Sequence, residues 1–441
     1  MSSAQMLRPT EVLLVFGLIS LLTLTYFLIQ VPAPFYNSSD WDGLQYIIMA
    51  EQFRQGQVIS AQGPEIFRIG SPFVVSLLPI DDLIEAFFYW ELTCAVLGAL
   101  LLYVWLRLHL RTRFLALMFT ALAVCTLWSP IRTIVFNRVV IEGSSFFLIM
   151  LAYFGVYLYE RSNKVRWVIV IAMLTAVGAT VREACLLPAL ALPFVGNPVT
   201  ATAFQEILRP WNLIPTLMKT IFAKERLLLM LPVACGLMTL VAVRLNVSLS
   251  DDFRYLWNAA WGFSDIGPLR YFGAIFYALG PLPLVVFFVP GFARRFLAEH
   301  QGYAVVLFMF IAMSWAALGD ERYFDWIMPI VFVMTGRVLE RHLDVIQNWA
   351  FFAVLIAFEF ISVRALFTIT DPNLPLIQRP IYEEALAHYL PDGWHFSEMH
   401  AYTADPKTVL TIVVINVLMG WTLWLLAARK RTEQNFQHDI E

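Results

Sequence analysis

The chain has 441 residues, of which 59% are hydrophobic and only 14% are charged, and its mean hydropathy is +0.69. A soluble protein of this length needs a more highly charged surface, so the composition indicates an integral membrane protein. The formal net charge of −3 excludes the strongly basic class of nucleic-acid-binding proteins.

Apolar runs long enough to cross a bilayer recur along the whole chain. A transmembrane helix needs about 20 apolar residues. In chain order, we expect spans at 11–31, 86–106, 114–131, 134–159, 227–246, 271–293, 303–319, 324–340, 348–367 and 408–428. These runs predict an all-α polytopic bundle that forms a single membrane domain over residues 1–441.

The apolar stretch 166–196 differs from the others because Arg182 and Glu183 interrupt it and Pro188 and Pro193 follow the interruption. One long tilted helix is one interpretation. We prefer a hairpin of two short helices, 166–181 and 184–196, with Arg182 at its tip. The predicted total is then about twelve membrane segments.

The positive-inside rule supports the hairpin. With the N-terminus inside, the inner segments carry 18 of the 30 Lys and Arg residues and four of the five lysines, Lys407 being the exception. A single span over 166–196 would instead place Arg429-Lys430-Arg431 outside. We therefore expect both termini to be cytoplasmic. The long outer loops are 32–85, 247–270 and 368–407, and an amphipathic segment, 197–226, lies on the inner surface.

The first outer loop contains a short amphipathic pattern. Leu44, Ile47, Ile48 and Met49 recur at helical spacing and predict a helix lying on the membrane surface. It begins near Asp40 and Asp42, which have two interpretations. They cap the helix, or one is a general base or both bind a divalent cation. The Asp81-Asp82 pair before the next span is expected to cap a helix.

Charged residues concentrate at the outer ends of the predicted spans, whereas only Glu359 falls near the middle of the membrane. Ionisable groups in spans are costly and indicate function. Snorkelling to the interface is the alternative explanation, but it does not explain why acids and arginines mix at this level. The residues are Glu91, Arg132, Arg138, Glu142, Arg182, Glu183, Arg244, Asp320, Glu321, Arg322, Tyr323 and Arg364.

Two further groups are less specific. The outer segment 379–407 contains Arg379, His395 and His400, which suggest acceptor binding or a lid; a metal site and a solvated loop are the alternatives. The cysteines lie in apolar runs without metal-ligand spacing and are expected to be buried apolar residues. They are Cys94, Cys125, Cys185 and Cys235.

Four short motifs together resemble the GT-C superfamily of membrane glycosyltransferases, in particular its bacterial members. They are DGxxYxxxA at 42–50, FRxxxP at 67–72, the TxRE run at 180–183 followed by LLP at 186–188, and Glu321-Arg322-Tyr323. The resemblance implies a polyprenyl-phosphate sugar as donor, transfer at the outer face of a bacterial inner membrane, and an acidic base in the first loop. That base would be Asp42, with Asp40 second.

The residues are compatible with this chemistry. Arginine is the usual ligand of a phosphate leaving group, and Arg68, Arg138, Arg182 and Arg322 lie at the outer level. Glu142, Glu183, Glu321 and Tyr323 would support them. The acceptor, whether glycan, glycolipid or protein, stays open, as does a divalent cation at Asp40 and Asp42. A transporter or flippase for a lipid-linked or anionic solute is the main alternative, and a transferase for acyl or phosphoalkyl groups is another.

Overall fold

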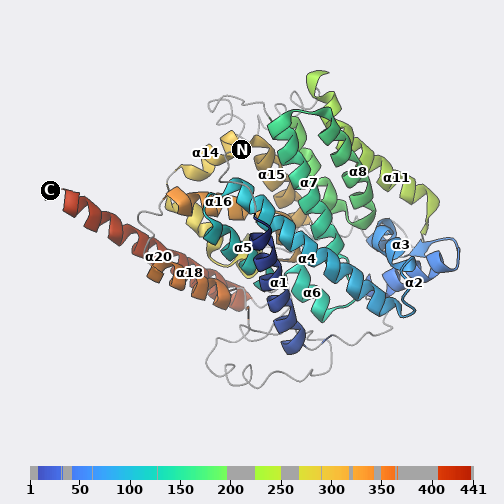
Figure 1. Ribbon diagram of the computed structural model, residues 1–441, viewed down its shortest axis with the longest axis horizontal. Helices are drawn as coiled ribbons and strands as arrows, with labels where there is room; N and C mark the ends of the chain where they lie inside the picture. Colours follow the sequence, from blue (N-terminus) through green and yellow to red (C-terminus); the bar gives the residue numbers. More distant parts are fainter. Residues whose placement is uncertain are drawn as a thin grey trace.

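The computed structural model describes residues 8–30, 32, 42–61, 63–126, 128–195, 224–249, 268–289, 291–316, 321–341, 349–362, 365 and 406–438. The chain is almost entirely helical in these ranges (Figure 1). One two-residue parallel pair joins β1 to β2, with Ser60 opposite Ser248 and Ala61 opposite Leu249. The predicted all-α class is therefore confirmed.

The N-terminal elements include the first loop and the helices that carry the site. They are α1 (Pro9–Ile29), α2 (Asp42–Arg54), β1 (Ser60–Ala61), the 3₁₀ helix η2 (Gly63–Phe67), α3 (Gly70–Ser76), α4 (Leu83–His109), α5 (Arg113–Cys125), α6 (Pro130–Phe136), α7 (Glu142–Ser162), α8 (Val165–Val181), η3 (Glu183–Leu186) and η4 (Pro188–Phe194).

The C-terminal elements are shorter and more often broken. They are η5 (Lys224–Met230), α11 (Leu231–Asn246), β2 (Ser248–Leu249), α13 (Pro268–Leu279), η7 (Leu282–Phe288), α14 (Phe292–Glu299), α15 (Gln301–Ala316), η8 (Glu321–Trp326), α16 (Met328–Arg341), α18 (Trp349–Ser362) and α20 (Pro406–His438).

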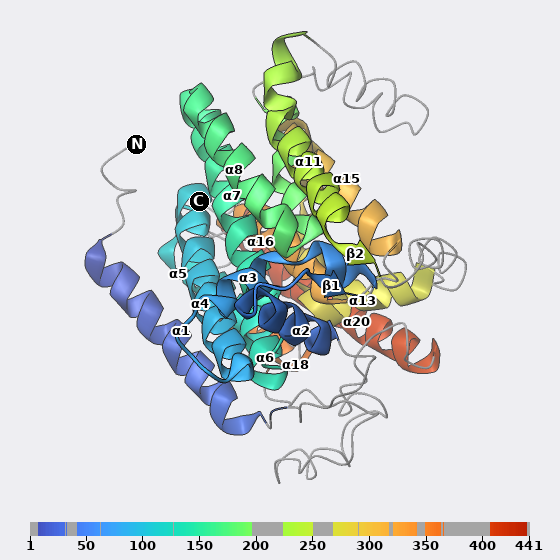
Figure 2. The same cartoon turned by 90° about the vertical axis from the view of Figure 1, so that its right-hand side faces the viewer.

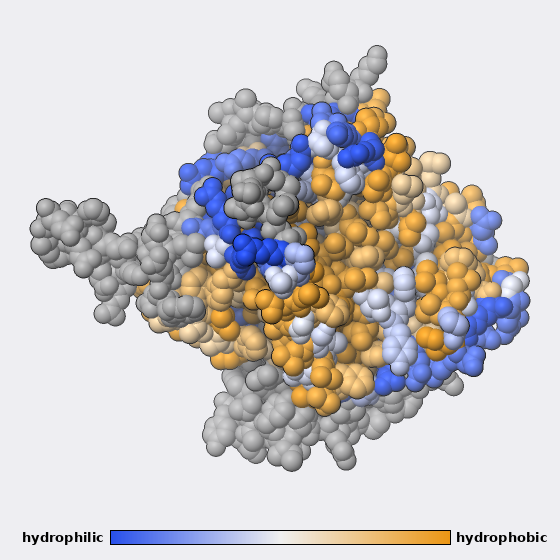
Figure 3. All heavy atoms as spheres, in the orientation of Figure 1, coloured by the Kyte–Doolittle hydropathy of each residue, from blue (hydrophilic) through white to orange (hydrophobic). Residues whose placement is uncertain are grey.

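Six helices among the described residues are long and apolar enough to cross a membrane, or up to eight if each of two sharply bent pairs counts as one span. Their outer surfaces are apolar. Along α8, for example, Ile169, Met173 and Val177 are all at least half exposed, which suits contact with lipid. Figure 3 shows an orange belt over this part of the molecule, with blue residues above it and at its lower right. The chain is thus a helical membrane protein, while the total of about twelve segments stays a prediction.

The two ends of the bundle are built from different elements. At one end, which we call the basic end, Glu11 of α1 pairs with Arg107 at the end of α4 (2.9 Å) and with Arg113 at the start of α5 (3.6 Å). At the opposite end, the loop end, α2 and α3 pack beside the starts of α4 and α7 and the end of α8 (Figure 2). The start of α1 therefore lies at the basic end.

Two breaks in the chain differ from the predicted spans. The predicted spans 114–131 and 134–159 are wrong at their junction: Ser129 caps a new helix that starts with Pro130, so α6 continues the first span and α7 starts only at Glu142. The predicted span 271–293 is not continuous. It bends by 99° between α13 and η7.

That bend has a clear cause. Pro281 has no backbone N–H, and Gly280 has a φ of 57°, a left-handed conformation that suits glycine. The carboxylate of Glu359 is 2% exposed and accepts a hydrogen bond from the backbone N–H of Leu282, the first residue of η7. The mid-membrane acid therefore caps a broken helix. A second pair, α14 and α15, bends by 108°.

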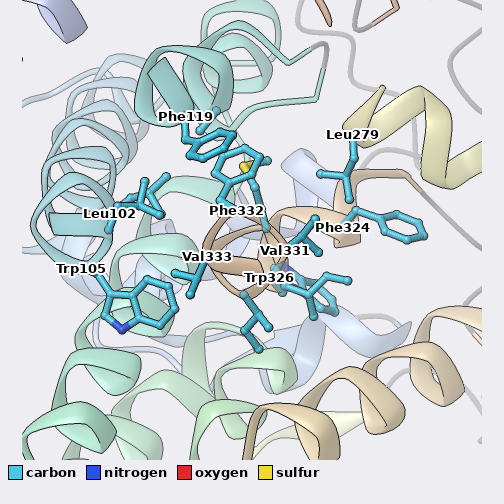
Figure 4. Close-up of a cluster of buried hydrophobic side chains, with 14 of the residues drawn as sticks. Leu102, Trp105, Phe119, Leu279, Phe324, Trp326, Val331, Phe332 and Val333 are labelled. Carbon is cyan, nitrogen blue, oxygen red and sulfur yellow. The ribbon is translucent and has the colours of Figure 1, made fainter. Parts of the chain in front are cut away.

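Aromatic and branched side chains fill the core between α4, α5 and α16 (Figure 4). Phe119 and Phe332 stack with ring centroids 5.0 Å apart. The hydroxyl of Tyr153 donates to the backbone carbonyl of Trp326 (3.1 Å). This bond fixes the end of η8, which also forms one wall of the site described below. The four cysteines are free thiols; Cys94, Cys125 and Cys185 are buried as predicted, whereas Cys235 is only partly buried.

Candidate functional site

Arg182 lies at the break between α8 and η3, as the hairpin prediction expected. Its backbone is extended, and the chain then turns back so that Cys185 packs on Gly178. The second limb is 3₁₀ rather than α-helical, in keeping with the two prolines within η4. The guanidinium of Arg182 is buried and its Nη1 donates to Glu142 Oε1 at 2.7 Å.

Two aromatic rings complete the surroundings of Arg182. Its guanidinium carbon lies 5.4 Å from the ring centroid of Tyr323 and 5.3 Å from that of Trp326. The two rings stack on each other with centroids 4.6 Å apart. Cation–π contacts of this kind hold a buried guanidinium in one orientation. Arg182 is thus firmly fixed from two sides.

Arg68 approaches from the first outer loop, between η2 and α3. Its Nη2 lies 3.4 Å from Glu183 Oε2, and its Nη1 donates to the hydroxyl of Tyr46 at 3.3 Å. Glu65 lies 3.9 Å away. Burial acts to lower the pKa of Arg68, but the charge of Glu183 and the bond with Tyr46 outweigh it, so this pKa lies well above its ordinary value. Arg68 therefore stays a cation.

The two guanidinium groups belong to one electrostatic unit. The positive charge of Arg68 interacts electrostatically with the guanidinium of Arg182, and Tyr323 interacts electrostatically with both groups. We call Arg68, Arg182 and their partners the arginine cluster. The partners are Tyr46, Glu65, Glu142, Glu183, Tyr323 and Trp326.

Donor capacity remains in the arginine cluster. The Nε atoms of Arg68 and Arg182 are both buried and have no hydrogen-bond partner among the described residues. A buried N–H without a partner costs free energy comparable to a lost hydrogen bond. The cluster can therefore bind a further group, such as an anion, that accepts hydrogen bonds from these N–H groups.

The two arginine-bearing segments approach closely at a glycine. A Cβ atom on Gly70 would lie 2.5 Å from Thr180 Oγ1 and 2.9 Å from a methyl group of Val181. Only glycine fits there without displacing these atoms. The absence of a side chain at position 70 lets the first outer loop lie directly against the end of α8.

The first-loop helix is present as α2, although its buried side differs from the prediction. Tyr46, Met49 and Ala50 face inward, whereas Ile48, predicted on the apolar side, is 36% exposed. Tyr46 is buried in preference to Ile48 because its ring packs in the core while its hydroxyl accepts a hydrogen bond from Arg68. The location of α2 on a membrane surface stays a prediction.

Asp42 is the first residue of α2, but its side chain lies outside the described part of the structure, as does all of Asp40. The neighbouring backbone can be placed. A Cβ atom on Gly43 would lie 3.0 Å from the carbonyl oxygen of Val139. The start of α2 therefore lies next to the segment that leads into Glu142 and the arginine cluster.

The other predicted residues divide into three groups. Arg138 lies over the ring of Phe88, 5.4 Å from its centroid, and not against Arg68 or Arg182. Glu321 and Arg322 begin η8, but their side chains are outside the described part. Arg379, His395 and His400 fall entirely outside the described residues. Within the described ranges, no group of three His, Cys, Asp or Glu residues could hold a metal ion.

Several residues of the cluster were missed by sequence reasoning. Tyr46 entered only as a motif letter, and Glu65 and Trp326 were not candidates. Trp326 could have been suspected because it lies three residues after Tyr323, at helical spacing. Nothing in the sequence places Glu65 beside Arg68, apart from their separation of three residues. The Asp81-Asp82 prediction is confirmed: Asp82 caps α4 by accepting from Ile84 N (2.8 Å).

A scan against protein-family models finds no match for this chain, and a search of curated proteins finds no relative.

Proposed function

We propose that the chain is a membrane glycosyltransferase that moves a sugar from a polyprenyl-phosphate donor to an acceptor at the outer face of the membrane. The observation that carries this proposal is the meeting of the buried guanidinium of Arg182 with that of Arg68, whose side chain is 12% exposed, from segments 114 residues apart, at one end of the bundle. Each retains a buried Nε–H without a partner among the described residues. The motif resemblance to the GT-C superfamily points the same way.

The two arginines have different tasks in this proposal. Arg182 is held by a 2.7 Å bond to Glu142 and by two rings, so it offers a fixed positive charge. The contacts of Arg68 are longer: 3.3 Å to the hydroxyl of Tyr46, 3.4 Å to Glu183 and 3.9 Å to Glu65. A phosphate can therefore replace Glu183 on Arg68 while Arg182 stays in place. Arginine suits this role because its planar group donates two parallel hydrogen bonds.

The reaction is a single displacement. An acceptor hydroxyl attacks the anomeric carbon, the bond from that carbon to the phosphate oxygen breaks, and polyprenyl phosphate leaves with the bonding electron pair. The base takes the acceptor proton. One carboxylate is sufficient for inversion in this way. Asp42 is the proposed base, with Asp40 second, because α2 starts beside the cluster. A divalent cation at these two aspartates is not required by the scheme.

The direct test is turnover in proteoliposomes that contain the purified protein. A panel of polyprenyl-phosphate hexoses and pentoses is supplied with a short-chain glycan, a glycolipid or a peptide acceptor. We expect release of polyprenyl phosphate that depends on one donor and one acceptor. Absence of release with every member of the panel counts against the proposal.

A transporter or flippase is the second candidate, and one observation favours it. The break between α13 and η7, capped by the buried acid Glu359, resembles the discontinuous helices that line binding sites in transporters. The same proteoliposomes separate the two. A flippase moves the donor between leaflets without consuming it, whereas the transferase releases polyprenyl phosphate.

We further propose about twelve membrane segments, an inner-membrane location in a bacterium and cytoplasmic termini. The pairing of Glu11 with Arg107 supports this, because it places the start of α1 at the basic end. In cells that express Lys164→Cys, Lys430→Cys or Tyr402→Cys, an impermeant maleimide should label only position 402. Labelling of position 430 from outside would contradict the hairpin. The parent chain is the control, since three of its cysteines are buried.

Glu183→Gln should tighten donor binding. Glu183 is the carboxylate that the phosphate displaces from Arg68, and its side chain is 32% exposed. Because a partly exposed pair contributes little, the KM for donor should fall by about two- to fivefold with kcat unchanged. Glu85→Gln, at an exposed acid in the first turn of α4, is the matched control. A higher KM for Glu183→Gln would mean that Glu183 holds Arg68 in place instead.

A further inference from the structure

A second polar network lies next to the arginine cluster, and its hydrogen bonds involve no arginine among the described residues. Glu91 of α4 is 0% exposed. Its Oε1 accepts from the hydroxyls of Ser71 (2.8 Å) and Ser144 (2.7 Å), and its Oε2 accepts from the backbone N–H of Ser144 (2.7 Å). The two serine oxygens are themselves 2.7 Å apart. We call Ser71, Glu91 and Ser144 the Glu91 network.

The network joins three elements that are distant in sequence. Ser71 belongs to α3 in the first outer loop, Glu91 to α4, and Ser144 to the first turn of α7. Glu91 thereby satisfies a backbone N–H that the start of α7 would otherwise leave without a partner. Every acceptor bond of the carboxylate is short, so the three elements are held in one arrangement.

Both arms of the Glu91 network end next to the arginine cluster. Ser71 follows Arg68 by three residues, and Ser144 follows Glu142, the partner of Arg182, by two. Between them, Gly143 lies directly on the backbone of α4: a Cβ there would lie 2.1 Å from the carbonyl oxygen of Glu91. Gly70 makes the matching close approach to the end of α8. Together with the short chain segments 68–71 and 142–144, these contacts form a closed ring that includes both arginines.

We propose that Glu91 is a positioning residue, which fixes the separation of Arg68 and Arg182 by bonding the first outer loop to the start of α7. Glu91 has no exposed surface, so it does not touch a ligand. Its effect passes through Ser71 to Arg68, and through Ser144 and Glu142 to Arg182. This inference rests on the proposed function only in the identity of the ligand that Arg68 and Arg182 bind.

The physical link is tested without any ligand by hydrogen–deuterium exchange. Ser71→Ala removes one bond of the Glu91 network. Ser76→Ala is the matched control on the same helix, because the hydroxyl of Ser76 is exposed and bonds only to the carbonyl of Phe73 in its own helix. Exchange in the peptide 63–76 should rise at least about threefold in Ser71→Ala and stay unchanged in Ser76→Ala. Unchanged exchange in both variants overturns the proposal.

Turnover tests whether this link positions the arginines. Glu91→Ala should raise the KM for donor about tenfold, while kcat stays within about threefold of the parent value. This is expected because the variant loses several buried hydrogen bonds that position the donor-binding arginines but take no part in the reaction. Glu91→Gln, in contrast, should have the same KM for donor as the parent protein. Its amide oxygen can accept from Ser144 N–H while its NH₂ group donates to both serine hydroxyls, which can each accept.

Three outcomes decide between the ideas. A raised KM for Glu91→Ala together with rescue by Glu91→Gln supports the proposal. Loss of kcat in Glu91→Gln, with normal folding, overturns it, because the charge of Glu91 would then take part in the reaction. If the parent chain transfers no sugar, the proposed function fails, while exchange in 63–76 still decides whether Glu91 bonds the loop to α7.

Discussion

Asp42→Asn is expected to give a folded, normally inserted protein whose turnover is lower by ~100-fold or more. The substitution keeps the size of the side chain and most of its capping ability, because asparagine also accepts hydrogen bonds. It removes the proton acceptor and any strong metal ligand. General-base catalysis typically contributes ~10²–10⁴-fold in rate, whereas loss of a cap costs about 1 kcal/mol of stability. The measurement is kcat in proteoliposomes beside thermal unfolding in detergent.

The capping interpretation predicts the opposite pattern. If Asp42 only caps α2, Asp42→Asn retains near-normal turnover and Asp42→Ala shows a mild loss of stability. Asp40→Asn tests the second aspartate of the loop. Normal turnover for Asp42→Asn with an inactive Asp40→Asn would move the base to Asp40. Normal turnover in both variants would leave the first loop without a catalytic role and reject the mechanism.

The positions of most helices could be predicted because apolar run length and charge distribution decide them. The spans at 11–31, 86–106 and 408–428 correspond to candidate spans in the structure. The cap at Asp82 was predictable for the same local reason, since a carboxylate before an apolar run satisfies the first N–H groups of a helix. Neither prediction needed knowledge of distant contacts.

Breaks inside apolar segments were harder to predict. Hydropathy does not change at Gly280-Pro281, so the predicted span 271–293 passes over that break, and near Ser129-Pro130 the predicted boundary falls at 132–133, a few residues too late. The proline signals were visible, but whether a proline kinks a membrane helix or ends it depends on the partner of the freed backbone group. At the Gly280-Pro281 break the N–H of Leu282 is met by Glu359, which comes from a helix about 80 residues later.

The pairing within the site could not be predicted either. The sequence indicated that arginines and acids share one level of the membrane, and it placed Arg182 at the tip of the hairpin. In the structure Arg182 pairs with Glu142, and Glu183 pairs with Arg68. Partner choice follows from the close approach at Gly70 and from the extended backbone of Arg182, and both are tertiary features.

Arg182→Gln is expected to lower turnover by ~10²–10³-fold, the usual effect of removing one group that stabilises charge on a leaving oxygen. It should also destabilise the protein by about 3–5 kcal/mol, because the buried carboxylate of Glu142 loses the cation that balances its charge. Loss of activity in this variant alone is therefore ambiguous. Thermal unfolding and kcat must be measured on the same preparation.

The double variant Arg182→Gln with Glu142→Gln separates the two effects. Two neutral amides can hydrogen-bond in place of the ion pair, so we expect most of the stability to return while turnover stays low, since no cation remains at this position. Arg107→Gln is the matched control at the basic end. Arg107 is 4% exposed and pairs with Glu11, so its loss should destabilise the protein without changing kcat at a temperature where it stays folded. Recovery of both stability and turnover in the double variant would show that Arg182 is structural and would leave Arg68 as the phosphate ligand to test next.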